Sequence, residues 1–150
     1  MDLKVDWVVG FTDGEGCFYV GLVKHPEMAL GYQVLPEFRV VQHKRDIQVL
    51  YGLKRFFGAG VVRQGHEDRY ELRIRKLESL VKVVEFFERH PLKTKKAVDF
   101  KRFARVVRWM TEGKHLTREG LVEIAEVAAE MNTGNKPSVQ AMLENLRSAG

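Results

Sequence analysis

The segment GFTDGEG, from Gly10 to Gly16, joins a stretch of helical periodicity to a stretch of strand alternation. Gly10 and Gly14 are four residues apart, so they share one helix face and let a second helix approach closely. Asp13 and Glu15 cluster at the C-terminal end of the same helix, where carboxylates are disfavoured by the helix dipole. A glycine cap accounts for Gly14 and Gly16 in part. Two carboxylates placed where the helix end disfavours them indicate a functional site.

Hydrophobic periodicity along the rest of the chain predicts one α+β domain over residues 1–150. The expected order is α-β-β-α-β-β-α, with an antiparallel four-stranded sheet, helices on one of its faces and extra C-terminal helices. The core covers about residues 3–112 and the helical extension about 115–150. Asp2 is expected to cap the first helix, which runs through Leu3, while Asp46 and Gly58 are expected to bound the second. The expected elements are a helix that ends at the glycines of the 10–16 segment, strands over 17–24 and 32–42, a helix over 46–58, a hairpin over 60–76, and helices over 77–90, 94–110, 117–131 and 138–147.

Composition narrows the class of partner. The chain has 150 residues, 45% of them hydrophobic, and a formal charge of +5, which favours a polyanion. Residues 1–114 hold 22 Lys and Arg against 15 Asp and Glu, whereas residues 115–150 hold 3 against 5. The single cysteine, Cys17, excludes an intramolecular disulfide and a cysteine-based zinc site. With no membrane-length apolar run and no targeting segment, the protein is expected inside a cell, in a prokaryotic cytoplasm or in a chloroplast or mitochondrion that encodes it.

Alternating side chains on the strands predict a surface that reads double-stranded DNA. On the 60–76 hairpin alone, an ordinary solvated face explains the charges equally well. The other two strands carry matching polar positions, and Arg, Gln and Glu suit the base edges of a duplex groove. The candidate DNA-binding residues are Tyr19, Gly21, Val23, His25, Gln33, Leu35, Glu37, Arg39, Arg63, Arg69, Glu71, Arg73 and Arg75.

The string VVGFTDGEG resembles the LAGLIDADG motif of the homing endonucleases, and the resemblance extends to the element order over residues 3–112. One motif copy in a chain of this length resembles the homodimeric, intron-encoded members. The resemblance implies a saddle-shaped sheet and a site-specific endonuclease that cuts both DNA strands at a long pseudo-palindromic site. It also implies Mg²⁺-dependent hydrolysis to 3′-hydroxyl and 5′-phosphate ends. In such a dimer, the helix holding Gly10 and Gly14, with Trp7 and Phe11, pairs with its counterpart.

The resemblance also assigns a catalytic set. Glu15 is the metal ligand, although most members have Asp there, and the Gly14 carbonyl assists it. Gln42 positions solvent near the scissile phosphate, and Lys95 is the active-site lysine. Asp13 is assigned to the helix end or to dimer packing rather than to the metal.

Lysines near residue 95 agree with a phosphate site. Lys93, Lys95 and Lys96 crowd a helix N-terminus, which an anion would stabilise. If the alignment of this chain with the family is shifted by one residue, Lys96 takes the catalytic role instead of Lys95. The basic residue that some relatives have after the glutamine falls near Asp46, so Lys44 or Arg45 would substitute.

Two other functions compete with cleavage. A non-cleaving nucleic-acid binder, such as an intron maturase or a transcription regulator, uses the same fold but has no need for Glu15 beside a phosphate backbone. An inert basic structural protein leaves the glycine and acid junction unexplained. His43, His66, His90 and His115 show no metal-ligand spacing and are expected on the surface.

Overall fold

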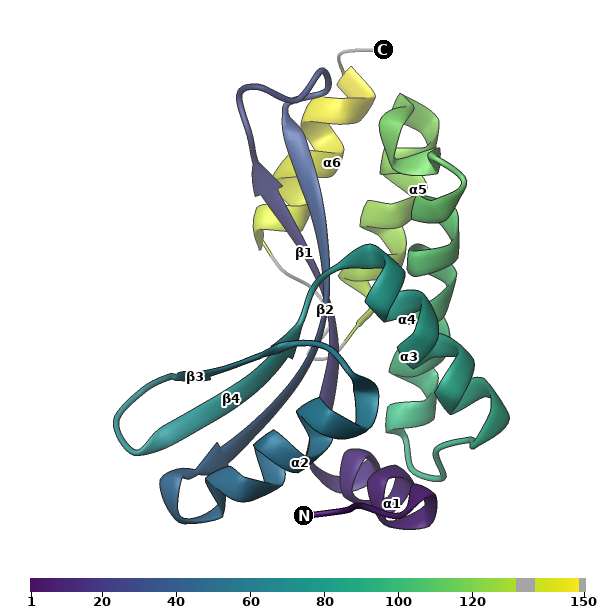
Figure 1. Ribbon diagram of the computed structural model, residues 1–150. Helices are drawn as coiled ribbons and strands as arrows, with labels where there is room; N and C mark the ends of the chain where they lie inside the picture. Colours follow the sequence, from purple (N-terminus) through teal and green to yellow (C-terminus); the bar gives the residue numbers. More distant parts are fainter. Residues whose placement is uncertain (132–136, 149–150) are drawn as a thin grey trace. The chain divides into compact units, whose positions relative to one another are not determined.

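A computed structural model of the chain describes residues 1–131 and 137–148 (Figure 1). It confirms the predicted order of elements. The elements are α1 Val5–Glu15, β1 Gly16–Lys24, β2 Tyr32–His43, α2 Ile47–Phe57, β3 Val61–Gln64, β4 Arg69–Ile74, α3 Leu77–Arg89, α4 Lys96–Thr111, α5 Arg118–Ala129 and α6 Pro137–Ser148, with short 3₁₀ turns at Lys44–Asp46 and Lys114–Leu116.

The four strands form one antiparallel sheet in the order β1-β2-β4-β3. Strand β4 is central to the hairpin region, because it pairs with β2 on one side and with β3 on the other. The registers place Arg39 opposite Arg73 and Arg63 opposite Glu71. The α+β fold class that the periodicity predicted is therefore confirmed.

The chain divides into two compact units, which are described separately. The first contains residues 1–18 and 37–98, and the second contains residues 19–36 and 99–150. None of the helices in the described parts of the chain combines the length and apolar character that crossing a bilayer requires.

Aromatic rings fill the core of the first unit. Phe18 of β1 and Phe38 of β2 lie 5.2 Å apart between ring centroids, and Phe87 of α3 meets Phe18 edge-on at 5.7 Å. Phe57 of α2 contacts Phe38 at 5.6 Å. Such tilted and edge-on pairs add to the free energy gained from burying the rings. One face of these strands is thus covered by α2 and α3, and its alternate residues point away from them.

The second unit is built around α4, α5 and α6, which bury apolar stripes spaced three or four residues apart. Helix α5 packs against α6. Val20 of β1 and Val34 of β2 are also buried, as the predicted alternation requires. The buried apolar residues of the helices include Phe103, Val107, Leu121, Ile124, Met142 and Leu143.

One predicted helix cap is wrong, and a second is correct in position only. Lys4 occupies the N-cap position of α1, so Asp2 does not cap this helix. Leu3 lies outside the helix and packs over Gly52 of α2, with its Cδ1 3.2 Å from where a Cβ on Gly52 would stand. Asp46 does occupy the N-cap position of α2, but its side chain makes no capping hydrogen bond.

The prediction that Gly58 ends α2 is confirmed. Its φ of 66° is left-handed, and its N–H donates to the Lys54 carbonyl at 2.8 Å.

The placement of the histidines was predicted only in part. His66 is exposed, but His43, His90 and His115 are half-buried. His90 lies against Phe86 with centroids 4.9 Å apart, so an apolar contact holds it. His115 lies in the second unit, and desolvation by burial lowers its pKa.

Candidate DNA interface and active site

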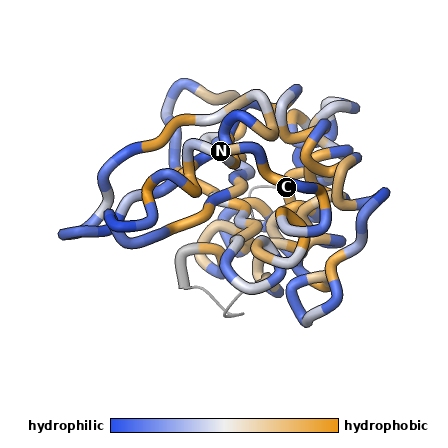
Figure 2. Tube along the Cα trace, turned by 60° about the horizontal axis from the view of Figure 1, so that its bottom comes forward, coloured by the Kyte–Doolittle hydropathy of each residue, from blue (hydrophilic) through white to orange (hydrophobic). Residues whose placement is uncertain are grey.

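The face of β2, β3 and β4 opposite the aromatic core carries a set of charged residues. Leu72 and Ile74 of β4 are buried, while Arg69, Glu71 and Arg73 alternate with them and face the other way. Figure 2 shows hydrophilic and hydrophobic stretches interleaved along the trace. The strand register aligns side chains of β2 and β3 with those of β4 across the sheet. The sheet therefore presents five arginines beside two glutamates: Arg39, Arg63, Arg69, Arg73 and Arg75 with Glu37 and Glu71.

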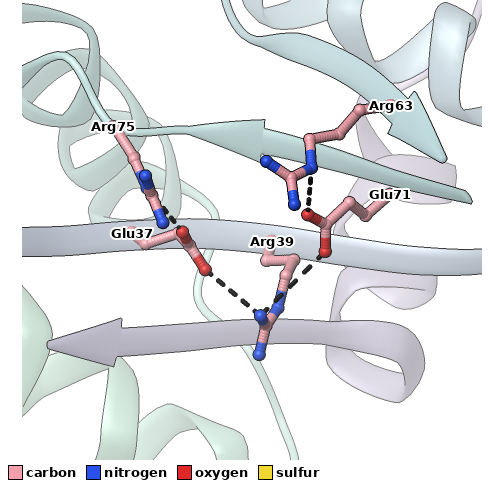
Figure 3. Close-up of polar contacts among 5 residues, drawn as sticks. All are labelled: Glu37, Arg39, Arg63, Glu71 and Arg75. Carbon is pink, nitrogen blue, oxygen red and sulfur yellow. Dashed lines mark hydrogen bonds and ion pairs between the residues drawn. The ribbon is translucent and has the colours of Figure 1, made fainter. Parts of the chain in front are cut away.

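Five of these side chains form a continuous ladder of alternating charge, which we call the Arg-Glu ladder (Figure 3). Arg75 Nε donates to Glu37 Oε1 at 2.7 Å, and the other Glu37 oxygen lies 3.5 Å from Nη1 of Arg39. Arg39 also lies 4.0 Å from Glu71, whose other oxygen is 3.0 Å from Nε of Arg63. The ladder crosses three strands, so it fixes the arginines relative to one another.

Glu37 is unusual within this ladder because it is only 3% exposed. A buried carboxylate is costly unless it is paired and hydrogen-bonded. The sequence predicted Glu37 and Glu71 as DNA-contacting residues. The structure adds that both carboxylates are engaged by arginines of the same chain.

Arg73 lies within the same face, directly between the β2 and β3 rows. Burial lowers the pKa of its guanidinium, and the neighbouring charges of Arg75 and Arg63 lower it further, against the opposing influence of Glu37 and Glu71. The guanidinium stays charged at neutral pH. Its surroundings therefore favour an added anion or hydrogen-bond acceptor.

The remaining predicted DNA contacts lie in the second unit, on β1, β2 and the segment after β1. Tyr19 and Gly21 are on one side of β1, and a Cβ on Gly21 would lie 3.3 Å from the Tyr19 ring and 3.4 Å from the Leu35 carbonyl. A side chain at this position would need Tyr19 to shift by a few tenths of an ångström, so the space beside Gly21 is tight. His25 donates its backbone N–H to Gly31 at 2.9 Å and closes the turn. Gln33 and Leu35 are half-buried on β2, and Val23 is exposed near the end of β1.

Helix α1 ends at Glu15, whose side chain is exposed. Asp13, two residues earlier, has a different environment. Its carboxylate accepts hydrogen bonds from the backbone N–H groups of Lys93 at 2.7 Å and Thr94 at 3.1 Å, and from the Thr94 hydroxyl at 2.5 Å. The expectation that Asp13 belongs to the helix end agrees with this contact, which ties α1 to the segment before α4.

The other two predicted catalytic residues also lie in the first unit. Gln42 is the next-to-last residue of β2, opposite Tyr70, and its Nε2 donates to the Val41 carbonyl at 2.8 Å. Lys95 is exposed and immediately precedes α4. Glu15 and Lys95 are each within two residues of the Asp13–Thr94 contact.

The structure also describes the substitutes named for these positions. Lys96 is the first residue of α4, and its charge helps to lower the pKa of Asp13. Arg45 makes a long ion pair with Asp46, at 3.9 Å. Lys96 and Arg45 thus each already interact with a carboxylate of their own chain.

An apolar stripe of α1 is exposed. Val8 and Thr12 are buried, whereas Gly10 and Gly14 have no atom within 4 Å of where a Cβ would stand, apart from the helix itself. Trp7 is 43% exposed and stacks on Phe11, with centroids 4.7 Å apart and ring planes 11° from parallel. The helix therefore offers a smooth apolar surface to a partner.

The oxygen ligands at the end of α1 can hold a hard cation only if a second carboxylate joins them. In the described part of the chain, no group of three or more His, Cys, Asp or Glu side chains could hold a metal ion. Asp13 is already hydrogen-bonded to Lys93 and Thr94, which leaves Glu15 and the Gly14 carbonyl. Oxygen donors of this kind fit Mg²⁺, which retains several waters.

Two features of the site were not predicted from the sequence. Thr94 was not singled out, although its hydroxyl accepts from Lys96 N–H at 3.3 Å and so caps α4. A threonine before the periodic segment TKKAV is a recognisable capping signal. The Arg-Glu ladder had no comparable local signal, because its contacts with Arg75, Glu71 and Arg63 join residues that are distant in sequence.

Comparison with known proteins identifies the family. Residues 8–107 match the family model described as LAGLIDADG endonuclease. The chain belongs to the LAGLIDADG endonuclease family. A probable intron-encoded endonuclease 3 of Neurospora crassa is 33% identical over 131 residues, which is 85% of this chain and 25% of that protein. The chain thus spans about a quarter of the length of that relative.

Solved LAGLIDADG structures match over nearly the whole chain. The homing endonuclease I-TnaI is 67% identical, with a TM-score of 0.95 over 98% of this chain and 100% of that chain. The I-SmaMI LAGLIDADG homing endonuclease bound to cleaved DNA is 33% identical, with a TM-score of 0.92 over 97% of this chain and 49% of that chain. The fold predicted from the motif is therefore the family fold.

Proposed function

We propose that this LAGLIDADG chain is a site-specific homing endonuclease that binds double-stranded DNA as a homodimer and cuts both strands at a long pseudo-palindromic site. The observation that carries the proposal is the pairing of an exposed Gly10–Gly14 stripe with an exposed Glu15 on the same short helix. A two-fold dimer through this stripe presents two copies of Glu15 near its axis, which supplies the carboxylate that one chain lacks.

The names of relatives support the proposal. I-TnaI is a homing endonuclease, and I-SmaMI was solved with cleaved DNA. The curated relative in Neurospora crassa is a probable intron-encoded endonuclease. An intron origin for this chain follows the same reasoning, and its location inside a cell stays a prediction.

The proposed chemistry is hydrolysis of phosphodiester bonds to 3′-hydroxyl and 5′-phosphate ends. Glu15, with the Gly14 carbonyl, would hold Mg²⁺, which activates water and stabilises the leaving oxygen when it is bound. Lys95 would place a positive charge beside the scissile phosphate. Gln42, whose Nε2 is held by the Val41 carbonyl, would orient a water molecule through its side-chain oxygen. Lys95 is preferred to Lys96 because Lys96 acts on Asp13.

Sequence reading is assigned to the alternate strand residues of both units. The Arg-Glu ladder gives three arginines fixed positions, and fixed donors are better suited to base edges than mobile ones. Arg69 and Arg73 extend the positive surface for the phosphate backbone or for guanine.

Cleavage of a randomised duplex library with Mg²⁺ tests the proposal directly. The wild-type protein should select a family of related pseudo-palindromes and cut both strands of each. Glu15→Gln should lower the cleavage rate at least ~100-fold while DNA binding persists, because the change removes a metal ligand and leaves the basic surface. Chelation of the metal should have the same effect. Glu85→Gln, which alters an exposed glutamate of α3, is the matched control and should cut normally.

Two outcomes would contradict the proposal. Cleavage by Glu15→Gln at the wild-type rate would place the metal elsewhere. Tight binding by the wild-type protein without cleavage of any selected duplex would favour the non-cleaving maturase or regulator.

A further inference from the structure

Asp13 is the most fully engaged carboxylate at the end of α1. Its two oxygens accept three hydrogen-bond donors from residues about eighty positions later in the chain: Lys93 N–H, Thr94 N–H and the Thr94 hydroxyl. Thr94 Oγ1 also lies 3.4 Å from the Asp13 backbone carbonyl. These contacts lie within the first unit. The end of α1 is therefore fastened to one short segment.

The same segment is fastened on its other side to the beginning of α4. Lys96 N–H donates to Thr94 Oγ1 at 3.3 Å, Ala97 N–H to the Thr94 carbonyl at 3.0 Å, and Val98 N–H to the Lys95 carbonyl at 3.0 Å. The backbone of Lys95 lies between the Asp13 contacts and this first helical turn. Its Cα position is consequently set by both.

The electrostatics of Asp13 agree with a structural contact. Desolvation raises the pKa of its carboxyl, but the hydrogen bonds from Thr94 and Lys93 and the charge of Lys96 outweigh it and hold the pKa below the ordinary value. The ionised form accepts all of these donors. An acceptor-only carboxylate is the side chain that can do so at this position.

We propose that Asp13 is a positioning residue for the cleavage reaction, which fixes the Lys93–Thr94 backbone and thereby holds Lys95 in register with Glu15 at the end of α1. The inference rests on the proposed endonuclease function and deepens it. Asp13 and Glu15 have different roles in the motif, because the Asp13 carboxylate contacts its own chain and the Glu15 side chain is exposed. A displacement of about 1 Å in a catalytic group can slow a reaction on the order of 100-fold.

A double-mutant cycle with Lys95 tests the inference. Single-turnover cleavage of the selected DNA site is measured for Asp13→Asn, for Lys95→Met and for the double variant, with DNA affinity and thermal unfolding measured in parallel. Asp13→Asn should slow cleavage ~10- to 100-fold, because an amide cannot accept at both atoms, while the DNA Kd changes less than about threefold. In the Lys95→Met background, Asp13→Asn should cost less than about threefold, because the group that it positions is absent.

A second pair of variants keeps the test independent of the folding of Asp13→Asn. Thr94→Val removes the hydroxyl at nearly constant volume and should slow cleavage in the same coupled manner. Thr94→Ser restores the hydroxyl and should recover most of the rate. Recovery by serine distinguishes the hydrogen bond from packing of the threonine methyl.

The inference and the proposed function fail in different ways. If Asp13→Asn or Thr94→Val slowed cleavage in the Lys95→Met background as much as it does with Lys95 present, the positioning role would be overturned and the proposed function would stand. An equal loss of DNA affinity and cleavage would overturn the positioning role as well. Wild-type cleavage by Lys95→Met would overturn the catalytic assignment of Lys95, and with it the inference.

Discussion

Glu37 and Arg75 form the shortest ion pair of the Arg-Glu ladder, with 2.7 Å between Oε1 and Nε, and Glu37 is only 3% exposed. A carboxylate buried on a surface proposed to meet DNA has a cost, since it repels phosphates as well as losing hydration. Its benefit is geometric. It holds Arg75 and Arg39 at fixed positions on neighbouring strands.

Substitution of Glu37 should therefore alter the selectivity of DNA binding more than its strength. Glu37→Gln removes the charge that Arg75 and Arg39 share, and should lower the free energy of unfolding by about 1.5–3 kcal/mol, the range for hydrogen bonds to charged groups. The arginines become free to contact phosphates, so affinity for random duplex should rise. A binding profile over all single-base variants of the selected site, with chemical denaturation, measures both effects.

Glu71→Gln is the matched comparison. Glu71 is less buried than Glu37, with side-chain exposures of 12% and 4%, and its contacts with Arg63 and Arg39 are 3.0 and 4.0 Å. Solvent screens such a pair more strongly, so the stability loss should be smaller. Equal or larger loss for Glu71→Gln would mean that burial does not control the ladder.

The ladder also shows where prediction from the sequence ends. Period-two alternation correctly predicted that Leu72 and Ile74 face the core and that Arg73 faces the other way, because alternation is a local property of a strand. It could not predict that Glu37 would meet Arg75, since that depends on the register between β2 and β4. Register is fixed by packing across the whole sheet.

The same distinction applies at the ends of the helices. Gly58 was predicted as a terminator because a left-handed residue has a local signature. Asp2 was wrongly predicted as a cap because Leu3 instead packs on Gly52, a contact made by tertiary structure. The Asp13–Thr94 contact joins residues that no sequence window contains together.

The exposed stripe of α1 gives a prediction about assembly. Gly10→Leu should leave the subunit folded, because no atom lies within 4 Å of the added Cβ apart from the helix itself, and replacing a helical glycine raises helix propensity by about 1 kcal/mol. The dimer should dissociate, because the side chain fills the space that the partner helix needs. Sedimentation should show a monomer, and cleavage of the palindromic site should be lost.

Two further glycine variants make the assembly test specific. Gly10→Ala adds one methyl group and should weaken the dimer less than leucine does. Gly16→Ala should damage folding instead, because its Cβ would lie 2.7 Å from Thr12 Cγ2 and 2.9 Å from the Thr12 carbonyl oxygen. A Gly10→Leu protein that remains dimeric and active would place the interface elsewhere.

Arg73 and Lys95 should differ in how their loss depends on DNA sequence. Arg73→Ala removes a donor from the strand face and should cost ~1–3 kcal/mol at particular base pairs, relaxing specificity there. Lys95→Ala should slow cutting at every cleavable sequence alike, because charge at the phosphate does not depend on base identity. Cleavage profiles of both variants over all single-base changes provide the comparison.

The two profiles can contradict the assignment separately. A uniform loss for Arg73→Ala would make it a backbone contact, which is the alternative that its cationic surroundings allow. A sequence-dependent loss for Lys95→Ala would mean that the start of α4 does not face the scissile phosphate.

His115 gives a prediction about pH. Burial lowers its pKa below the ordinary value of 6.5, and its Nδ1 is buried without a hydrogen-bond partner in the described part of the chain. The unfolded chain binds a proton near pH 6.5 that the folded chain does not, so stability is fully present above that pH and is lost as the pH falls below it. The thermal midpoint of the wild-type protein should therefore decrease as the pH is lowered from 7.5 to about 5.5, and the midpoint of His115→Gln should decrease less over that interval.

His66→Gln, at an exposed hairpin position, is the control and should follow the wild-type curve. Identical curves for His115→Gln and wild-type protein would show that other groups govern the acid limb.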